Sequence, residues 1–97
     1  MNLVWTRSAR KDRREIFEFI QVDSVRAACK IDVIFLQKAA LLARFPELGR
    51  PGRVSETREL LAHRHYFIIY RIRRNQLEIL RLLHTSRQWP PESRQRF

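Results

Sequence analysis

A cluster of turn-forming residues divides this 97-residue chain into two halves with different hydrophobic periodicity. Pro46, Gly49, Pro51 and Gly52 lie close together, and residues of these types favour turns and end any helix that reaches them. Apolar residues recur every three or four positions before the cluster and largely alternate after it. The first period is helical and the second is that of a strand, so we expect helices followed by a sheet.

The first half is predicted to begin with a short strand and an amphipathic helix. Residues 3–6 form a β-prone run that ends in charged residues. Ser8 then stands in an N-cap position before a helix over residues 9–20. The apolar face of this helix is predicted to contain Ala9, Ile16, Phe17, Phe19 and Ile20.

A second and longer helix is predicted to follow, with Asp23 or Ser24 as its N-cap and its end before Pro46. Its apolar positions repeat at helical spacing and are Ala28, Ile31, Phe35, Ala39 and Leu42. Cys29, the only cysteine of the chain, lies near this stripe, and we expect it to be buried as a small apolar residue.

The second half is predicted to form three strands, at residues 57–61, 66–72 and 77–84, with a hairpin loop at residues 73–76. Apolar residues occupy both faces of the last two strands, so both faces should be at least partly covered. Strict alternation in the last strand would place four residues on one face: Leu77, Ile79, Arg81 and Leu83.

These elements predict an α+β fold in the order β-α-α-β-β-β, with a helical hairpin packed on a small antiparallel sheet. A chain of this length has room for a single core. We expect one domain over residues 1–90, followed by a flexible C-terminal tail over residues 91–97.

The charge balance predicts an anionic partner. Twenty basic residues stand against ten acidic ones, which gives a net charge of +10, and seventeen of the basic residues are arginines. From residue 53 onward ten arginines stand against four glutamates, so the sheet half is strongly basic. Such a surface attracts nucleic acid, an acidic protein or an anionic membrane, and composition alone leaves these three open.

No cofactor, metal site or membrane segment is expected. A single cysteine cannot form an internal disulfide, and no Cys/His cluster has zinc spacing. The sequence contains no apolar run long enough for a signal peptide or a membrane span. These features favour a soluble cytoplasmic protein.

Four side chains of the sheet half are candidate site residues: Arg58, Arg81, His84 and Arg87. Paired carboxylates, a Gly-rich phosphate loop and a Ser-His-Asp order are all missing from the sequence. Metal-independent RNA cleavage needs a base for the ribose 2′-hydroxyl, cations for the phosphorane and an acid for the leaving oxygen. His84 could act as the base or acid, and the arginines could gather on one concave surface to hold phosphate.

Structural roles for the same residues stay open at this point. Arg81 could instead lie in a buried ion pair with Glu59 or Glu78, and His84 could be a structural histidine. Tyr70 is expected in the core with its hydroxyl hydrogen-bonded.

The strand sequences resemble those of a known group of proteins. Arg58-Glu-Leu-Leu is followed by Tyr66-Phe-Ile-Ile-Tyr-Arg-Ile72 and by Leu77-Glu-Ile-Leu-Arg-Leu-Leu-His-Thr-Ser-Arg87. A predicted helical hairpin and a Gly-Arg-Pro-Gly turn precede them. This combination is similar to the RelE/ParE superfamily of toxins from bacterial type II toxin–antitoxin modules, over residues 1 to about 90.

The resemblance implies a compact α+β toxin that a small antitoxin with an acidic segment neutralises, and a role in plasmid stabilisation. RelE-like members cut messenger RNA in the ribosomal A site, whereas ParE-like members inhibit DNA gyrase and are not nucleases. Arg58 and Arg87 match basic positions of RelE. Leu60 and Phe67 stand where RelE has a lysine and an arginine.

We predict ribosome-dependent mRNA cleavage as the first function, because a chain of charge +10 suits the phosphate-rich ribosome surface. Inhibition of DNA gyrase, without nuclease activity, is the alternative. A third class, a nucleic-acid-binding module without toxicity, is distinguished by the absence of growth arrest.

Overall fold

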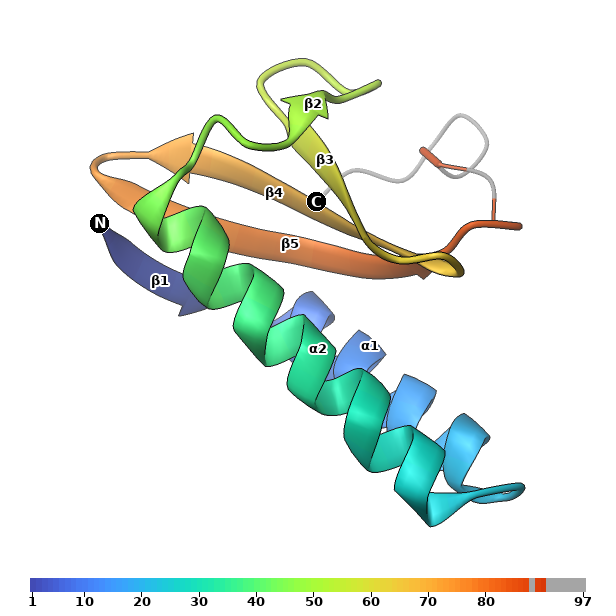
Figure 1. Cartoon of the computed structure of the whole chain (residues 1–97). Coiled ribbons are helices and arrows are strands. Elements are labelled where there is room, and N and C mark those ends of the chain that lie inside the picture. Colours follow the sequence, from blue (N-terminus) through green and yellow to red (C-terminus); the bar gives the residue numbers. More distant parts are fainter. Residues whose placement is uncertain (88, 91–97) are drawn as a thin grey trace.

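A helical hairpin packs against one face of a twisted sheet in the computed structural model, which describes residues 1–87, 89 and 90 (Figure 1). The predicted tail at residues 91–97 lies outside the described residues. The elements in chain order are β1 (Asn2–Trp5), α1 (Arg7–Gln21), α2 (Val25–Arg44), β2 (Arg50–Pro51), β3 (Arg58–His63), β4 (Tyr66–Arg73) and β5 (Gln76–His84).

The α+β class and the order of the long elements are confirmed, with two differences in the sheet. Its strand order is β1-β5-β4-β3-β2, and β1 pairs with β5 in parallel whereas the other pairs are antiparallel. The helical hairpin carries the chain across the sheet after β1, as a parallel connection requires. The two-residue strand β2 was not predicted; it contains Pro51, which only a sheet edge accommodates readily.

The caps of the helices connect them to their surroundings. Thr6, rather than Ser8 as predicted, caps α1, since its Oγ1 accepts a hydrogen bond from the Ala9 amide at 3.1 Å. The same hydroxyl lies 2.9 Å from the carbonyl oxygen of Ile79 in β5 and so ties the helix start to the sheet. Ser24 caps α2 by accepting from the Ala27 amide at 3.0 Å, which confirms one of the two predicted caps.

The main core lies between the helices and the sheet. Small residues on the helices, such as Ala9 and Ala39, allow the layers to approach closely, and Phe35 meets Tyr66 edge to face with ring centroids 5.5 Å apart. The strands contribute Ala62, Ile68, Tyr70, Leu77, Ile79 and Leu82. A second cluster on the opposite face, formed by Ile69, Leu80, Leu83 and Trp89, confirms that both faces of the sheet are covered.

A β-bulge at Leu80 interrupts the ladder between β4 and β5. Tyr70 pairs with Ile79 and Ile69 pairs with Arg81, so Leu80 has no partner of its own. One extra residue reverses the alternation of side chains beyond it.

The faces of β5 therefore differ from strict alternation. Leu82 lies in the core cluster with Leu77 and Ile79, whereas Leu83 lies in the cluster on the opposite face. The prediction that Arg81 and Leu83 share a face with Leu77 is wrong beyond the bulge.

Cys29 is exposed, and the prediction that it is buried is wrong. The preceding residue, Ala28, faces the core together with Phe35 and Leu42. One residue turns an α-helix by about 100°, so Cys29 lies on a side of α2 that points away from the sheet.

Tyr70 fastens the turn-forming linker to the sheet. Its hydroxyl donates to the carbonyl oxygen of Pro46 at 2.7 Å and accepts from the Gly49 amide at 2.9 Å, which confirms the expected buried tyrosine with a satisfied hydroxyl. A Cβ at position 49 would lie 2.6 Å from this hydroxyl and 2.8 Å from the carbonyl oxygen of Glu59. Only glycine fits there, which explains the residue's place in the linker.

Tyr70→Phe is expected to lower the free energy of unfolding by about 2 kcal/mol, because it leaves the Gly49 amide and the Pro46 carbonyl without their partner. Urea unfolding followed by circular dichroism measures the change. Tyr66→Phe is the matched control, since the Tyr66 hydroxyl makes no hydrogen bond to a described residue and should cost clearly less. Equal losses for the two variants would contradict this account.

Candidate functional site

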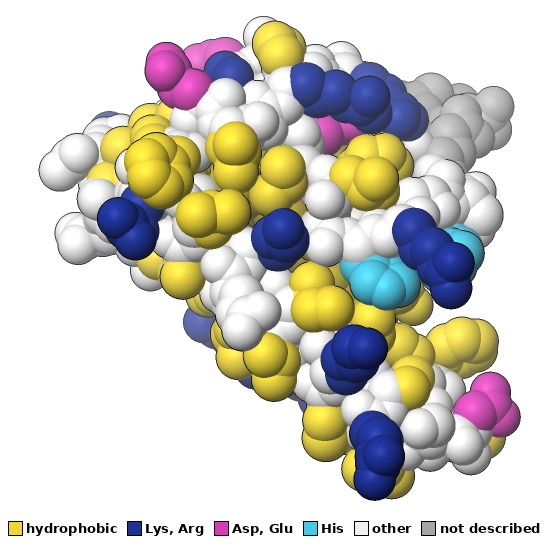
Figure 2. Space-filling model, in the orientation of Figure 1, with side chains coloured by type: hydrophobic (Ala, Val, Ile, Leu, Met, Phe, Trp, Pro, Cys, Tyr) yellow, Lys and Arg dark blue, Asp and Glu magenta, His cyan; other side chains and the backbone are white. Residues whose placement is uncertain are grey.

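A groove of about 460 Å³ runs between α1 and the end of β5. Its lining is Asp12, Glu15, Ile16 and Phe19 from α1, Tyr66 from β4, Leu82 and His84 from β5, and Arg87. Figure 2 shows the molecule hollowed between the end of the sheet and the far part of the helical hairpin. We call this hollow the α1–β5 groove; it combines an apolar floor with a charged rim, as protein and ligand sites do.

Phe19 projects at the edge of this groove with 76% of its surface exposed. It was predicted on the apolar face of the first helix, but α1 extends past the end of the sheet and leaves it uncovered. An exposed phenylalanine beside an apolar floor is a feature of contact surfaces rather than of a core.

A buried carboxylate joins α1 to β5 at one wall of the groove. Asp12 is 7% exposed; its Oδ2 lies 2.7 Å from Nε of Arg81 and its Oδ1 lies 3.1 Å from Nη2. Oδ2 also accepts the Leu82 amide at 3.0 Å, beyond the point where β1 ends and β5 loses its neighbour. The predicted partners of Arg81 were Glu59 and Glu78, and the ion pair is instead made with Asp12.

The two glutamates have other cationic partners. Glu59 is buried, and its Oε1 lies 3.2 Å from Nη2 of Arg50 while its Oε2 accepts the Arg53 amide at 3.1 Å. Glu78 pairs with Arg71 across the β4–β5 ladder. Together with the Arg81–Asp12 pair, these contacts engage four arginines in ion pairs: Arg50, Arg53, Arg71 and Arg81.

Arg58 supports the linker and lies away from the other predicted site residues. Its Nε donates to the carbonyl oxygen of Gly49 and its Nη2 to that of Glu47, each at 3.1 Å. In the register of the sheet, Arg58 on β3 lies opposite Tyr70 of β4, whereas His84 on β5 lies opposite Tyr66 of β4. Four residues of β4 separate these positions by about 13 Å, so Arg58 does not meet His84 on one surface.

His84 stands at the end of β5 in a fixed orientation. Its ring stacks on the ring of His65, with the ring centroids 5.6 Å apart. It meets the ring of Tyr66 edge to face, with the centroids 5.3 Å apart. Nδ1 accepts the Ser86 amide at 3.1 Å, so the neutral ring carries its proton on Nε2. Burial raises the pKa of the Tyr66 hydroxyl, which therefore stays protonated at neutral pH.

Arg87 is the residue that the structure brings next to His84. Its amide donates to the carbonyl oxygen of His84 at 2.9 Å, and both side chains line the α1–β5 groove. Arg87 is exposed and makes no salt bridge with any described residue. Of the four predicted residues, these two share the groove mouth, Arg81 lies behind the groove as the partner of the wall residue Asp12, and Arg58 lies elsewhere. Their functional roles remain predictions.

The sequence did not indicate the α1 residues of the site. Glu15 and Ile16 belong to the amphipathic pattern of the predicted helix, where any core helix carries similar residues. Only the packing of α1 against β5 makes them groove residues.

Among residues 1–87, 89 and 90 no group of three or more His, Cys, Asp or Glu side chains could hold a metal ion. In that same part of the chain no helix has the length and apolar character to cross a bilayer.

Comparison with known proteins identifies the class to which this fold and groove belong. Residues 3–89 match the family described as the ParE toxin of the type II toxin–antitoxin system parDE. The Sinorhizobium fredii protein named "Putative toxin Y4kP" is 41% identical over 87 residues, which cover 89% of this chain and 90% of that protein.

Solved structures agree with the sequence matches. A chain of the chromosomal ParDE system from P. aeruginosa superposes with a TM-score of 0.76 at 25% identity, covering 87% of this chain and 95% of that one. The YoeB/ParE toxin from Agrobacterium tumefaciens has the same fold, with a TM-score of 0.55 at 23% identity and coverage of 87% and 98%. The molecule is a toxin of the type II toxin–antitoxin class. It belongs to the ParE toxin family, within the RelE/ParE superfamily that the strand sequences indicated.

Asp12→Ala is expected to lower the free energy of unfolding by about 3 kcal/mol, because it leaves Arg81 and the Leu82 amide without their partner. Asp32→Ala is the matched control: Asp32 also binds an arginine through both oxygens, Arg13, but this pair is more exposed. Its loss should cost about 1 kcal/mol or less. Chemical denaturation of both variants gives the comparison, and a smaller loss for Asp12→Ala than for Asp32→Ala would refute the assignment.

Arg87→Ala is expected to abolish growth arrest while the protein stays folded, since the side chain is a cation at the groove mouth that forms no salt bridge with residues 1–87, 89 and 90. Induction from a tightly controlled promoter and colony counting measure the toxicity, and a thermal melt checks the fold. Arg73→Ala removes one exposed charge at the opposite end of the sheet and should remain toxic. Full toxicity of Arg87→Ala would remove this residue from the site.

Proposed function

We propose that the chain arrests growth by inhibiting DNA gyrase through protein contacts, without cutting RNA, and that a small antitoxin with an acidic segment neutralises it. Membership of the ParE toxin family supports this assignment over a RelE-like activity. Gyrase acts in the cytoplasm, so this is where the toxin is proposed to work.

The observation that carries the proposal is the closure of the sheet face opposite the helices. Trp89 is 7% exposed and packs against Ile69, Leu80 and Leu83. The carbonyl oxygen of Trp89 accepts a hydrogen bond from Nη1 of Arg53 at 3.3 Å. The cavity beside Trp89 has a volume of only about 10 Å³. An RNA strand needs an open surface for its phosphates and bases, and in the part of the chain that the structure describes the apolar cluster of this face is covered.

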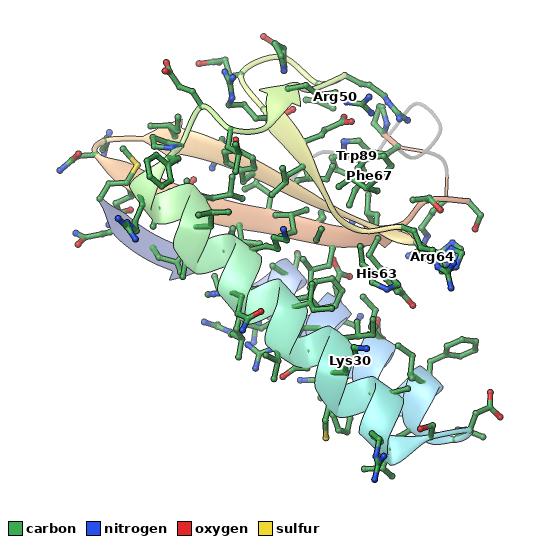
Figure 3. All side chains as sticks on the ribbon, in the orientation of Figure 1. Lys30, Arg50, His63, Arg64, Phe67 and Trp89 are labelled. Atoms are coloured by element: carbon green, nitrogen blue, oxygen red, sulfur yellow. The ribbon has the colours of Figure 1, made fainter. Side chains whose placement is uncertain are left out.

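The aromatic side chains of that face are covered by arginines. The guanidinium carbon of Arg81 lies 5.9 Å from the Trp89 ring centroid and that of Arg50 lies 5.4 Å from the Phe67 centroid. Figure 3 shows Arg50, Phe67 and Trp89 gathered on this side of the sheet. Rings that already stack on guanidinium groups are not free to stack on bases.

The cations needed for RNA cleavage are also dispersed. Arg81 is paired with Asp12, and Arg58 bonds the linker at a register position about 13 Å along β4 from that of His84. Stabilising a phosphorane requires donors that converge on the same phosphate oxygens. Of these three arginines only Arg87 lines the α1–β5 groove with His84, which supports docking of a protein rather than phosphate chemistry.

The α1–β5 groove is suited to a protein segment. Ile16, Tyr66 and Leu82 form an apolar floor beside the exposed Phe19, and Arg87 can pair with a carboxylate at the rim. A partner that fills this floor and carries acidic residues would bury apolar surface and neutralise part of the net charge of +10. These are the properties expected of the antitoxin.

RelE-like mRNA cleavage on the ribosome is the second candidate function. It is favoured by His84, whose Nδ1 accepts the Ser86 amide so that Nε2 is left for the chemistry, and which lies next to Arg87, a cation without a salt bridge to any described residue. A base or acid and one cation are the minimum for this chemistry.

Gyrase assays with the purified chain test the proposal. We expect inhibition of negative supercoiling and accumulation of cleaved DNA, with no new transcript ends on ribosome-bound messages. His84→Gln separates the candidates: a gyrase inhibitor should retain its activity, whereas a nuclease that depends on this ring should lose about 100-fold or more. Cleaved messages together with unimpaired gyrase would establish the second candidate, and normal growth on induction would exclude both.

A further inference from the structure

The outer side of α2 carries a line of apolar side chains that no described residue covers. Val25, Val33 and Leu36 are 60%, 49% and 41% exposed, and the exposed residues Cys29 and Ala40 lie between and beyond them. Spacings of four, four, three and four residues place all five on one strip of the helix. We call this strip the α2 seam.

The α2 seam is separate from the α1–β5 groove and from the core. The core-facing residues of α2 are Ala28, Phe35, Ala39 and Leu42, which occupy a different side of the helix. Fifteen residues separate the ends of the seam, so it is about 22 Å long. Single exposed apolar residues are ordinary on a protein surface, but a continuous line at helical spacing is the pattern that binds another helix.

Basic side chains border the seam along the solvent side of α2. Arg26 and Lys30 are exposed, one turn apart, and each lies three or four residues from a seam residue. Figure 2 shows basic and hydrophobic side chains interspersed along this face, and Figure 3 shows Lys30 projecting outward from α2.

The border toward α1 is basic as well. Asp32, one turn from Cys29 and from Leu36, is already bound by Arg13 at 2.7 Å. Next to it a hollow of about 300 Å³ is lined by Arg10, Arg13, Arg14, Phe17, Glu18 and Asp32. Excess positive charge therefore flanks the seam on both sides, with Phe17 extending its apolar surface onto α1.

We propose that the α2 seam docks an amphipathic helix of a protein partner, with apolar residues at three- and four-residue spacing and Asp or Glu on either side of them. The charges select this occupant over a second copy of the chain, which would bring two basic borders and two net charges of +10 together. The apolar strip favours an amphipathic helix over nucleic acid, because apolar side chains offer no hydrogen-bond donors to phosphates. The inference goes beyond the proposed function, since it holds for this surface whichever target the toxin has.

Cys29 makes the docking measurable, because it is the only cysteine of the chain and lies within the seam. The probe is a synthetic helical peptide of about 18 residues, with Leu at the seam spacing and Glu at the flanking positions, added to the full chain. We expect it to slow modification of Cys29 by a maleimide at least about tenfold at saturation, since a packed helix excludes the reagent from the covered thiol. The same peptide with Lys in place of Glu should give no protection.

Val33→Asp should weaken binding of the Glu peptide at least about tenfold, since it places an unpaired carboxylate in the contact. Leu61→Asp is the matched control: Leu61 is 51% exposed, as Val33 is 49% exposed, but it lies on β3, and this variant should bind normally. Lys30→Glu changes only an exposed charge and should reduce the preference for the Glu peptide over the Lys peptide, because the other basic residues of the borders remain. Circular dichroism establishes that each variant is folded.

Three results would overturn the proposal: equal protection by the Glu and Lys peptides, equal weakening by the Val33 and Leu61 variants, or a dimer that cross-links through Cys29 at low concentration. The last would make a second copy the occupant. None of these measurements depends on gyrase, so an inactive toxin in the gyrase assay and a failed docking test are separate outcomes.

Discussion

The contact between Asp12 and β5 is the interaction on which the arrangement of the groove and of the closed sheet face depends. The Asp12 carboxylate accepts hydrogen bonds from the guanidinium of Arg81 and from the amide of Leu82. It therefore fastens α1 to the part of β5 that lies beyond its pairing with β1. The same guanidinium lies over Trp89 on the far side of the sheet. A single ion pair therefore links the helical layer, the strand and the covering of the opposite face, and it occupies an arginine that could otherwise bind phosphate.

The distribution of the arginines explains how a chain of charge +10 can present surfaces suited to protein partners. Several arginines form contacts within the chain. Arg13 and Arg71 form ion pairs with Asp32 and Glu78, and Arg58 donates hydrogen bonds to carbonyl oxygens of the linker. Two of those that remain exposed border apolar surfaces: Arg87 at the α1–β5 groove and Arg26 beside the α2 seam. Positive charge around an apolar contact favours acidic protein partners, because both the apolar burial and the charge pairing then contribute to binding.

Much of the fold could be predicted from local patterns, whereas most of the site could not. The Ser24 cap, the buried Tyr70 and the strand pair β4–β5 follow from residue type and periodicity. The partner of Arg81 lies 69 positions away on a helix, and no local signal selects it over the nearer glutamates. The bulge at Leu80 is likewise invisible to an alternation rule, yet it decides which face each later residue of β5 occupies.

The sequence by itself determined the α+β class, the order of the long elements, the strong positive charge and the turn-forming linker, because these depend on residue type and on periods of two and 3.6 residues. Tertiary structure alone decided which arginines are neutralised, that His84 and Arg87 share a groove mouth with Phe19, and that Cys29 faces outward. Each of these depends on contacts between segments far apart in the chain, and such contacts form only when the layers pack.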